Sequence, residues 1–146
     1  MEPVKREATT VWTGSLVAGS GQLDSGTGVI SAPVTWASRT EEPAGKTSPE
    51  ELIASAHSSC FAMAFSHALT TGGNEPEQLT VTSVVTLEPK PGGGVQVTES
   101  ILTVVGKVAG LTDEQFKAAA VEAEKGCPIS NALRGNVKIT VKASLA

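Results

Sequence analysis

Short runs of β-branched and apolar residues, separated by glycine and serine, make up the first 38 residues of the chain. The run Thr9–Thr13 is typical of a strand, and the glycines that follow it are typical of turns. This pattern predicts a meander of three strands over residues 8–38. Residues 39–47 are mostly polar and include proline and glycine, so we expect them to form an exposed loop.

A long helix is predicted to follow this loop. Ser48 is a good N-cap, Pro49 suits the first helical position, and Glu51 stands where a capping box places an acidic residue. The helix should continue to about Thr71 and end at the Gly-Gly pair that follows. Because nearly all of its faces are apolar or small, we expect a central, buried helix.

The rest of the chain predicts a β-hairpin, two helices and a last strand. Strands over residues 79–90 and 95–108 flank a turn made of proline and glycine. Three further elements should follow: a helix over residues 112–125 opened by a capping box, a short helix from Pro128 to about Gly135, and a strand over 137–145. The order βββ-α-ββ-α-α-β predicts an α+β fold with an antiparallel sheet, in a single domain over residues 1–146.

Composition and charge exclude several classes of function. Hydrophobic residues make up 40% of the chain and charged residues 18%, as in a folded globular protein. Three Phe, two Trp and no Tyr are too few aromatics for a platform that stacks nucleic-acid bases. A net charge of −4 offers no attraction to nucleic acid or to anionic membranes, so neither is expected as a partner.

The N-terminal residues are polar and lack the apolar segment of a secretory signal, so a cytoplasmic location is expected. The longest apolar stretch, residues 52–69, is interrupted by serine and histidine and predicts a core helix rather than a membrane span. In the cytoplasm a resting structural disulfide is unusual, and paired thiols are more often catalytic or redox-sensing.

Two cysteines are the main candidates for chemistry. Cys60 lies in the apolar helix, where a lone cysteine is usually a small core residue. Cys127 precedes Pro128 at the N-cap of the short helix, where unpaired backbone N–H groups favour a thiolate. The pair could be two inert core residues, a stapling disulfide worth on the order of 4 kcal/mol, or a catalytic thiol with its resolving partner.

Four segments carry a family resemblance: Arg39, Lys46–Ile53 (KTSPEELI), Ala56–Met63 (AHSSCFAM) and Lys125–Ser130 (KGCPIS). Together they resemble the OsmC/Ohr peroxiredoxin family over nearly the whole chain. The opening Trp-Thr-Gly and the position of the arginine are more similar to the OsmC branch than to the Ohr branch. The resemblance implies an OsmC-like fold and a homodimer with its sites at the interface.

The resemblance also implies a thiol-dependent peroxidase that reduces organic hydroperoxides, with hydrogen peroxide as a poorer or alternative substrate. Cys60 would attack the peroxide and become a sulfenic acid, which Cys127 would resolve to a disulfide. Arg39 would lower the pKa of Cys60, and Glu50 would orient Arg39 through a bidentate ion pair. An external dithiol, such as a lipoyl group, would re-reduce the disulfide, and no organic or metal cofactor is expected.

Helix geometry bears on where these residues act. Ten residues of straight helix separate Glu50 from Cys60 by roughly 15 Å, so one Arg39 could not easily serve both within a chain. Either the helix bends between them, or Arg39 and Glu50 reach Cys60 of a partner subunit. We expect the second arrangement, in an intertwined two-fold dimer. Phe61, Met63 and Phe65 are candidates for an apolar peroxide pocket.

One alternative to this scheme remains. The chain could be a non-enzymatic, stress-induced structural or binding protein whose cysteines form only a staple. His57 lies one helical turn from Cys60, but four Cys and His residues without a finger or ribbon spacing argue against a metal site. His57 and His67 are instead expected to be hydrogen-bonded core or interface residues.

Overall fold

The computed structural model describes all 146 residues, which form strands and helices in the order β1, β2, β3, α1, α2, β4, β5, α3, α4, β6. They group into two compact units, Met1–Leu52 and Ile53–Ala146. The single domain expected over residues 1–146 stays a prediction. The mixed α+β composition agrees with the fold class expected from the sequence.

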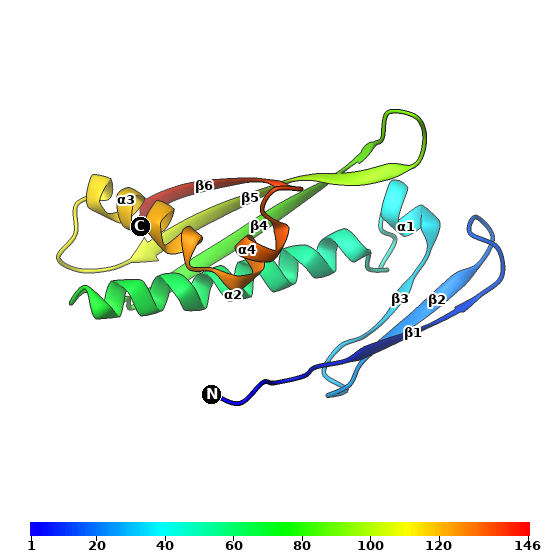
Figure 1. Cartoon of the computed structure of the whole chain (residues 1–146), viewed down its shortest axis with the longest axis horizontal. Helices are drawn as coiled ribbons and strands as arrows, with labels where there is room; N and C mark the ends of the chain where they lie inside the picture. The colour runs from blue at the N-terminus through cyan, green and yellow to red at the C-terminus, as the bar shows by residue number, and fades with distance from the viewer. The chain divides into compact units, whose positions relative to one another are not determined.

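The first unit contains the predicted three-stranded meander (Figure 1). Strands β1 (Ala8–Thr13), β2 (Ser20–Ser25) and β3 (Ser31–Val34) pair antiparallel in sequence order. Every residue of β1 is exposed in the isolated chain, so this sheet has little core of its own.

A short helix, α1 (Trp36–Thr40), replaces the end of the predicted strand region and the start of the predicted loop. It begins there because Thr35 and Ser38 cap one another: each side chain accepts from the other's backbone N–H at 3.0 Å. The expectation that Arg39 lies in an exposed loop was therefore wrong. Arg39 belongs to the last turn of α1 and is half-buried.

Helix α2 (Pro49–Thr71) begins and ends where the sequence predicted. The Ser48 hydroxyl accepts from the Glu51 N–H at 3.2 Å, as an N-cap should. Within one chain, however, α2 is buried along one face only: its fully or almost fully buried residues beyond the first turn are His57, Phe61, Phe65 and Leu69. They recur every fourth residue, so the opposite face, where Met63 is 69% exposed, lacks a partner.

The second unit is built on the sheet β4-β5-β6. Strands β4 (Gln78–Pro89) and β5 (Val95–Lys107) form the predicted antiparallel hairpin. Strand β6 (Lys138–Leu145) pairs with β5 in the parallel direction, which differs from the fully antiparallel sheet expected. The reason is the connection: two helices intervene between β5 and β6, and such a crossover returns the chain in the same direction.

Those two helices are α3 (Asp113–Lys125) and α4 (Pro128–Leu133). The predicted capping box opens α3, with Thr112 and Gln115 each accepting from the other's backbone N–H. Cys127 is the N-cap residue of α4, as the sequence indicated, and its side chain makes no capping hydrogen bond. No helix of the structure has both the length and the apolar character needed to cross a bilayer.

One face of the second sheet forms the core. Alternate residues of β5 point inward, and they pack with three phenylalanines, Phe61 and Phe65 of α2 and Phe116 of α3. The ring centroid of Phe65 lies 5.6 Å from that of Phe61 and 5.0 Å from that of Phe116. Helices α2 and α3 therefore pack on the same face of the sheet, and Cys127 at the start of α4 belongs to this core.

Candidate active site

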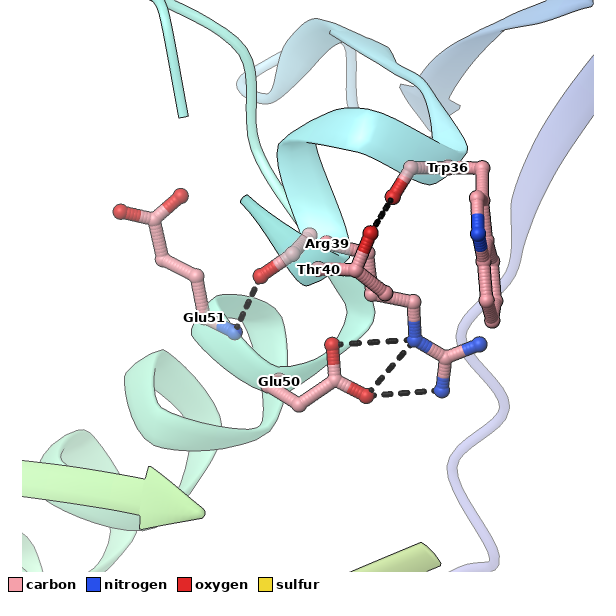
Figure 2. Close-up of polar contacts among 6 residues, drawn as sticks. Trp36, Arg39, Thr40, Glu50 and Glu51 are labelled. Carbon is pink, nitrogen blue, oxygen red and sulfur yellow. Dashed lines mark hydrogen bonds and ion pairs between the residues drawn. The ribbon is translucent and has the colours of Figure 1, made fainter. Parts of the chain in front are cut away.

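Arg39 and Glu50 form a close ion pair in the first unit. Arg39 donates from Nε and Nη2 to Glu50 Oε1 at 3.0 and 2.7 Å, and from Nε to Oε2 at 3.2 Å (Figure 2). Glu50 is only 7% exposed, so its charge needs this partner. The ion pair implied by the family resemblance is thus present in the chain, and its catalytic role stays a prediction.

The indole ring of Trp36 lies against the guanidinium of Arg39. The Arg39 Cζ atom lies 5.9 Å from the centroid of the indole ring, within the range of a cation–π contact. Figure 2 shows the indole ring beside the guanidinium. The Nη1 atom of Arg39 makes no hydrogen bond within the chain. Arg39 therefore has a fixed plane and one terminal nitrogen left to donate to another group.

An apolar cavity of about 230 Å³ adjoins Arg39 within the first unit. Its lining is almost entirely apolar: Thr10, Trp12, Leu16, Leu23, Val34, Thr35, Trp36, Arg39, Pro49 and Leu52. The sequence had suggested Phe61, Met63 and Phe65 for such a pocket. None of the three lines this cavity, because both phenylalanines lie in the core of the second unit and Met63 lies on the exposed face of α2.

The two cysteines meet in the second unit. Both are free thiols, with Cys60 half-buried and Cys127 fully buried. Cys60 packs against the core cluster that contains Cys127, close enough for the Cys127 thiol and the Ile129 backbone to affect the pKa of the Cys60 thiol. The chain fold therefore brings together two sulfur atoms from α2 and from the start of α4.

Cys60 is not ionised by its own surroundings. Burial raises the pKa of the Cys60 thiol, the hydrogen bond from the Ile129 backbone lowers it, and the neighbouring Cys127 thiol raises it again. The result is a pKa above the ordinary value. A thiolate at Cys60 near neutral pH thus requires a positive charge beyond these groups.

His57 is completely buried one turn before Cys60. Its Nδ1 lies 2.7 Å from Ser100 Oγ, and its Nε2 lies 2.8 Å from Ser130 Oγ. Burial lowers the pKa of His57, against the smaller, opposing effect of the Glu124 carboxylate. The prediction of a hydrogen-bonded core histidine is confirmed for His57, whereas His67 is exposed in the single chain.

Comparison with known proteins places this chain in a family. The family described as OsmC-like protein matches residues 42–142. The chain is 31% identical over 137 residues to Peroxiredoxin OsmC of Escherichia coli K12, a match that covers 93% of this chain and 94% of that protein. The chain belongs to the OsmC family.

Other members of the OsmC/Ohr group are also similar. The organic hydroperoxide resistance protein OhrB of Bacillus subtilis is 25% identical over 84% of this chain and 88% of its own length. The crystal structure of an organic hydroperoxide resistance protein from Elizabethkingia anophelis superposes with a TM-score of 0.77 at 25% identity, over 100% of both chains. The fold of this OsmC family member is therefore that of the wider group.

The sequence analysis missed two features of the site. The partners of His57 come from Ser100 and Ser130, 43 and 73 residues away, and no local pattern indicates them. The contribution of Trp36 to the Arg39 site depends on α1, which was not predicted. The Thr-x-x-Ser spacing that caps α1 was present in the sequence and could have indicated this helix.

No group of three or more His, Cys, Asp and Glu side chains is arranged as a metal site.

Proposed function

We propose that the chain is a thiol-dependent peroxidase that reduces organic hydroperoxides, with Cys60 as the peroxidatic and Cys127 as the resolving residue. The observation that carries this proposal is that two free thiols lie together in the core of a member of the OsmC family, with Cys60 packed against the cluster that contains Cys127. Relatives named peroxiredoxin and organic hydroperoxide resistance protein support the same activity.

The reaction has three balanced steps. The Cys60 thiolate attacks the terminal oxygen of the hydroperoxide, so that an S–O bond forms, the O–O bond breaks, and the released alkoxide takes a proton to become an alcohol. Cys127, as thiolate, then attacks the Cys60 sulfenic acid, forming the disulfide and releasing water after protonation. An external dithiol, for which lipoyl groups are the proposed source, returns two electrons and restores both thiols.

Arg39 is proposed to supply the positive charge that Cys60 lacks. Its guanidinium is always protonated, and Glu50 and Trp36 fix its plane. The free Nη1 donor can bind a peroxide oxygen and stabilise the negative charge that develops on the leaving alkoxide. Because Glu50 and Cys60 are separated by roughly 15 Å of helix, we infer that Arg39 acts on Cys60 of the partner subunit.

A homodimer is proposed for two reasons. The separation of Glu50 from Cys60 requires a partner subunit, and apolar side chains are exposed on the single chain. Large apolar side chains remain exposed in the single chain, including Val11 at 65% and Met63 at 69%. A large contiguous apolar surface on a globular protein commonly marks a contact with another chain. A second copy of this chain would cover the open face of α2.

The cavity beside Arg39 supports an organic rather than an inorganic substrate. Its volume of about 230 Å³ far exceeds the ~30 Å³ that a water molecule occupies in the liquid. Hydrogen peroxide would leave most of this apolar space unfilled, whereas an alkyl or aryl hydroperoxide would bury its organic group there.

Comparison of Cys60→Ser with Cys127→Ser tests the proposal. Consumption of cumene hydroperoxide and of hydrogen peroxide is followed by stopped flow with excess dithiol. Cys60→Ser should abolish turnover, and Cys127→Ser should still perform one oxidation to the sulfenic acid. A wild-type protein without turnover, in which both variants lose stability equally, would instead indicate a stapling disulfide in a non-enzymatic protein.

A further inference from the structure

His57 joins three elements of the second unit through its imidazole ring. It projects from α2, its Nδ1 binds Ser100 of β5, and its Nε2 binds Ser130 of α4. The Ser100 hydroxyl is itself 3.1 Å from that of Ser83 on β4. Both ring nitrogens of a fully buried histidine are therefore satisfied by hydroxyl groups, on opposite sides of the ring.

Helix α4 depends on such contacts because it is only six residues long. A helix of this length has almost no stability of its own in water. Two other side-chain contacts connect this region to α3. Arg134, which follows α4, pairs with Glu124 at 2.7 Å, and Asn131 donates to the Lys125 carbonyl at 3.2 Å. Ser130 provides the side-chain hydrogen bond that ties α4 to α2.

The position of α4 determines the surroundings of Cys60. Cys127 is its N-cap residue, and Ile129 lies in its first turn. Cys127 belongs to the core cluster, and Cys60 and Ile129 both pack against that cluster. His57 is one turn before Cys60 on the same helix, so the bond from His57 to Ser130 lies beside these contacts.

We propose that His57 is a positioning residue that, through Ser130, holds α4 so that Cys127 and the Ile129 backbone stay against Cys60. This inference rests on the proposed function, since it concerns the step in which Cys127 resolves the Cys60 sulfenic acid. That step competes with a second hydroperoxide, which converts the sulfenic acid to a sulfinic acid and releases a second alcohol. A displaced α4 slows resolution, so more of the enzyme becomes over-oxidised.

Ser130→Ala and Ser100→Ala form a matched pair for the test. Each removes one hydroxyl from one ring nitrogen of His57, but only Ser130 belongs to α4. Mass spectrometry of protein treated with graded cumene hydroperoxide measures the ratio of disulfide to Cys60 sulfinic acid. We expect this ratio to fall by about tenfold in Ser130→Ala and His57→Gln, since small displacements of reacting groups have effects of this size, and by much less in Ser100→Ala.

Thermal unfolding separates positioning from simple destabilisation, because the two serine variants should lose similar stability. Equal ratios in the wild type, His57→Gln and Ser130→Ala would overturn the proposal. So would an equal fall in both serine variants. If His57→Gln does not fold, the comparison of Ser130→Ala with Ser100→Ala still tests the proposal.

A second oxidant makes the test independent of peroxidase activity. Diamide converts two neighbouring thiols to a disulfide, itself being reduced to the hydrazine, and requires no hydroperoxide. We expect disulfide formation by diamide to slow in Ser130→Ala relative to Ser100→Ala. A wild type that consumes no hydroperoxide but shows this difference would refute the proposed function and keep the positioning role, whereas equal diamide rates would refute the positioning role alone.

Discussion

Arg39 and Glu50 are joined by hydrogen bonds from two different guanidinium nitrogens, Nη2 at 2.7 Å and Nε at 3.0 Å, to the same carboxylate oxygen. The pair links the last turn of α1 to the first turn of α2 within the first unit. It fixes the direction of the guanidinium while leaving Nη1 without a partner in the chain.

Glu50→Gln should lower peroxidase activity by about tenfold or more, because a neutral amide cannot hold the guanidinium with two charge-assisted hydrogen bonds. Glu51→Gln is the matched control: Glu51 lies in the same turn, is exposed, and accepts from Thr47 instead. The measurement is kcat/KM for cumene hydroperoxide. Equal activities of the two variants would contradict a role for the ion pair.

Trp12→Ala should change substrate preference by enlarging the cavity beside Arg39 and removing apolar contact. We expect kcat/KM to fall by about tenfold for cumene hydroperoxide and by much less for hydrogen peroxide, since one to a few kcal/mol of apolar contact is lost. Val17→Ala, an exposed residue outside the cavity lining, serves as the control. A parallel fall for both peroxides would argue that the cavity does not bind the organic group.

Met63→Glu should weaken the proposed homodimer. Met63 is 69% exposed on the open face of α2, where a second chain would bury it, and a buried unpaired carboxylate is costly. Light scattering after size exclusion should show a dimer for the wild type and a monomer for the variant. Val121→Glu, on the exposed side of α3, is the control and should stay dimeric. A dimeric Met63→Glu would exclude this face of α2 from the interface.

Lowering the pH should destabilise the protein through His57. Burial lowers the pKa of His57 in the folded chain, so the unfolded chain binds a proton first as the pH falls below the ordinary value of about 6.5. The free energy of unfolding should therefore be unaffected by His57 above that value and decrease below it, until the folded-state pKa is reached. Urea unfolding between pH 7.5 and 5 measures the slope, which should be shallower in His57→Gln than in His67→Gln.

Gly106→Ala should destabilise the second unit by about 1–3 kcal/mol through overpacking. An added Cβ would overlap the ring of Phe116, which is fully buried against the sheet. Gly72→Ala is the control, because its Cβ would come no closer than 3.4 Å to the Ala68 carbonyl oxygen, an ordinary contact. Chemical unfolding measures both, and equal effects would show that the core near Phe116 can relax.

Local interactions explain why so much of the fold could be predicted. The Ser48 cap of α2, the Thr112 capping box of α3 and the β4–β5 hairpin each depend on residues a few positions apart, and all three occur where the sequence indicated. Helix α1 depends on an equally local cap at Thr35 and Ser38. It was missed because the glycine-rich β pattern before it led to the assignment of residues 8–38 to strands. The parallel pairing of β6 depends on where the chain returns after α3 and α4, which no local pattern specifies.

By itself, the sequence determined the order of every element except α1, the ends of α2 and the four segments that resemble the OsmC/Ohr group, because capping, turns and motifs are properties of neighbouring residues. Only the tertiary structure decided that Cys60 meets Cys127, that one face of α2 stays open, and that His57 bonds to Ser100 and Ser130. These contacts join residues dozens of positions apart. They exist because the sheet and its helices bury their apolar faces against one another in one core. That packing determines which polar side chains become neighbours.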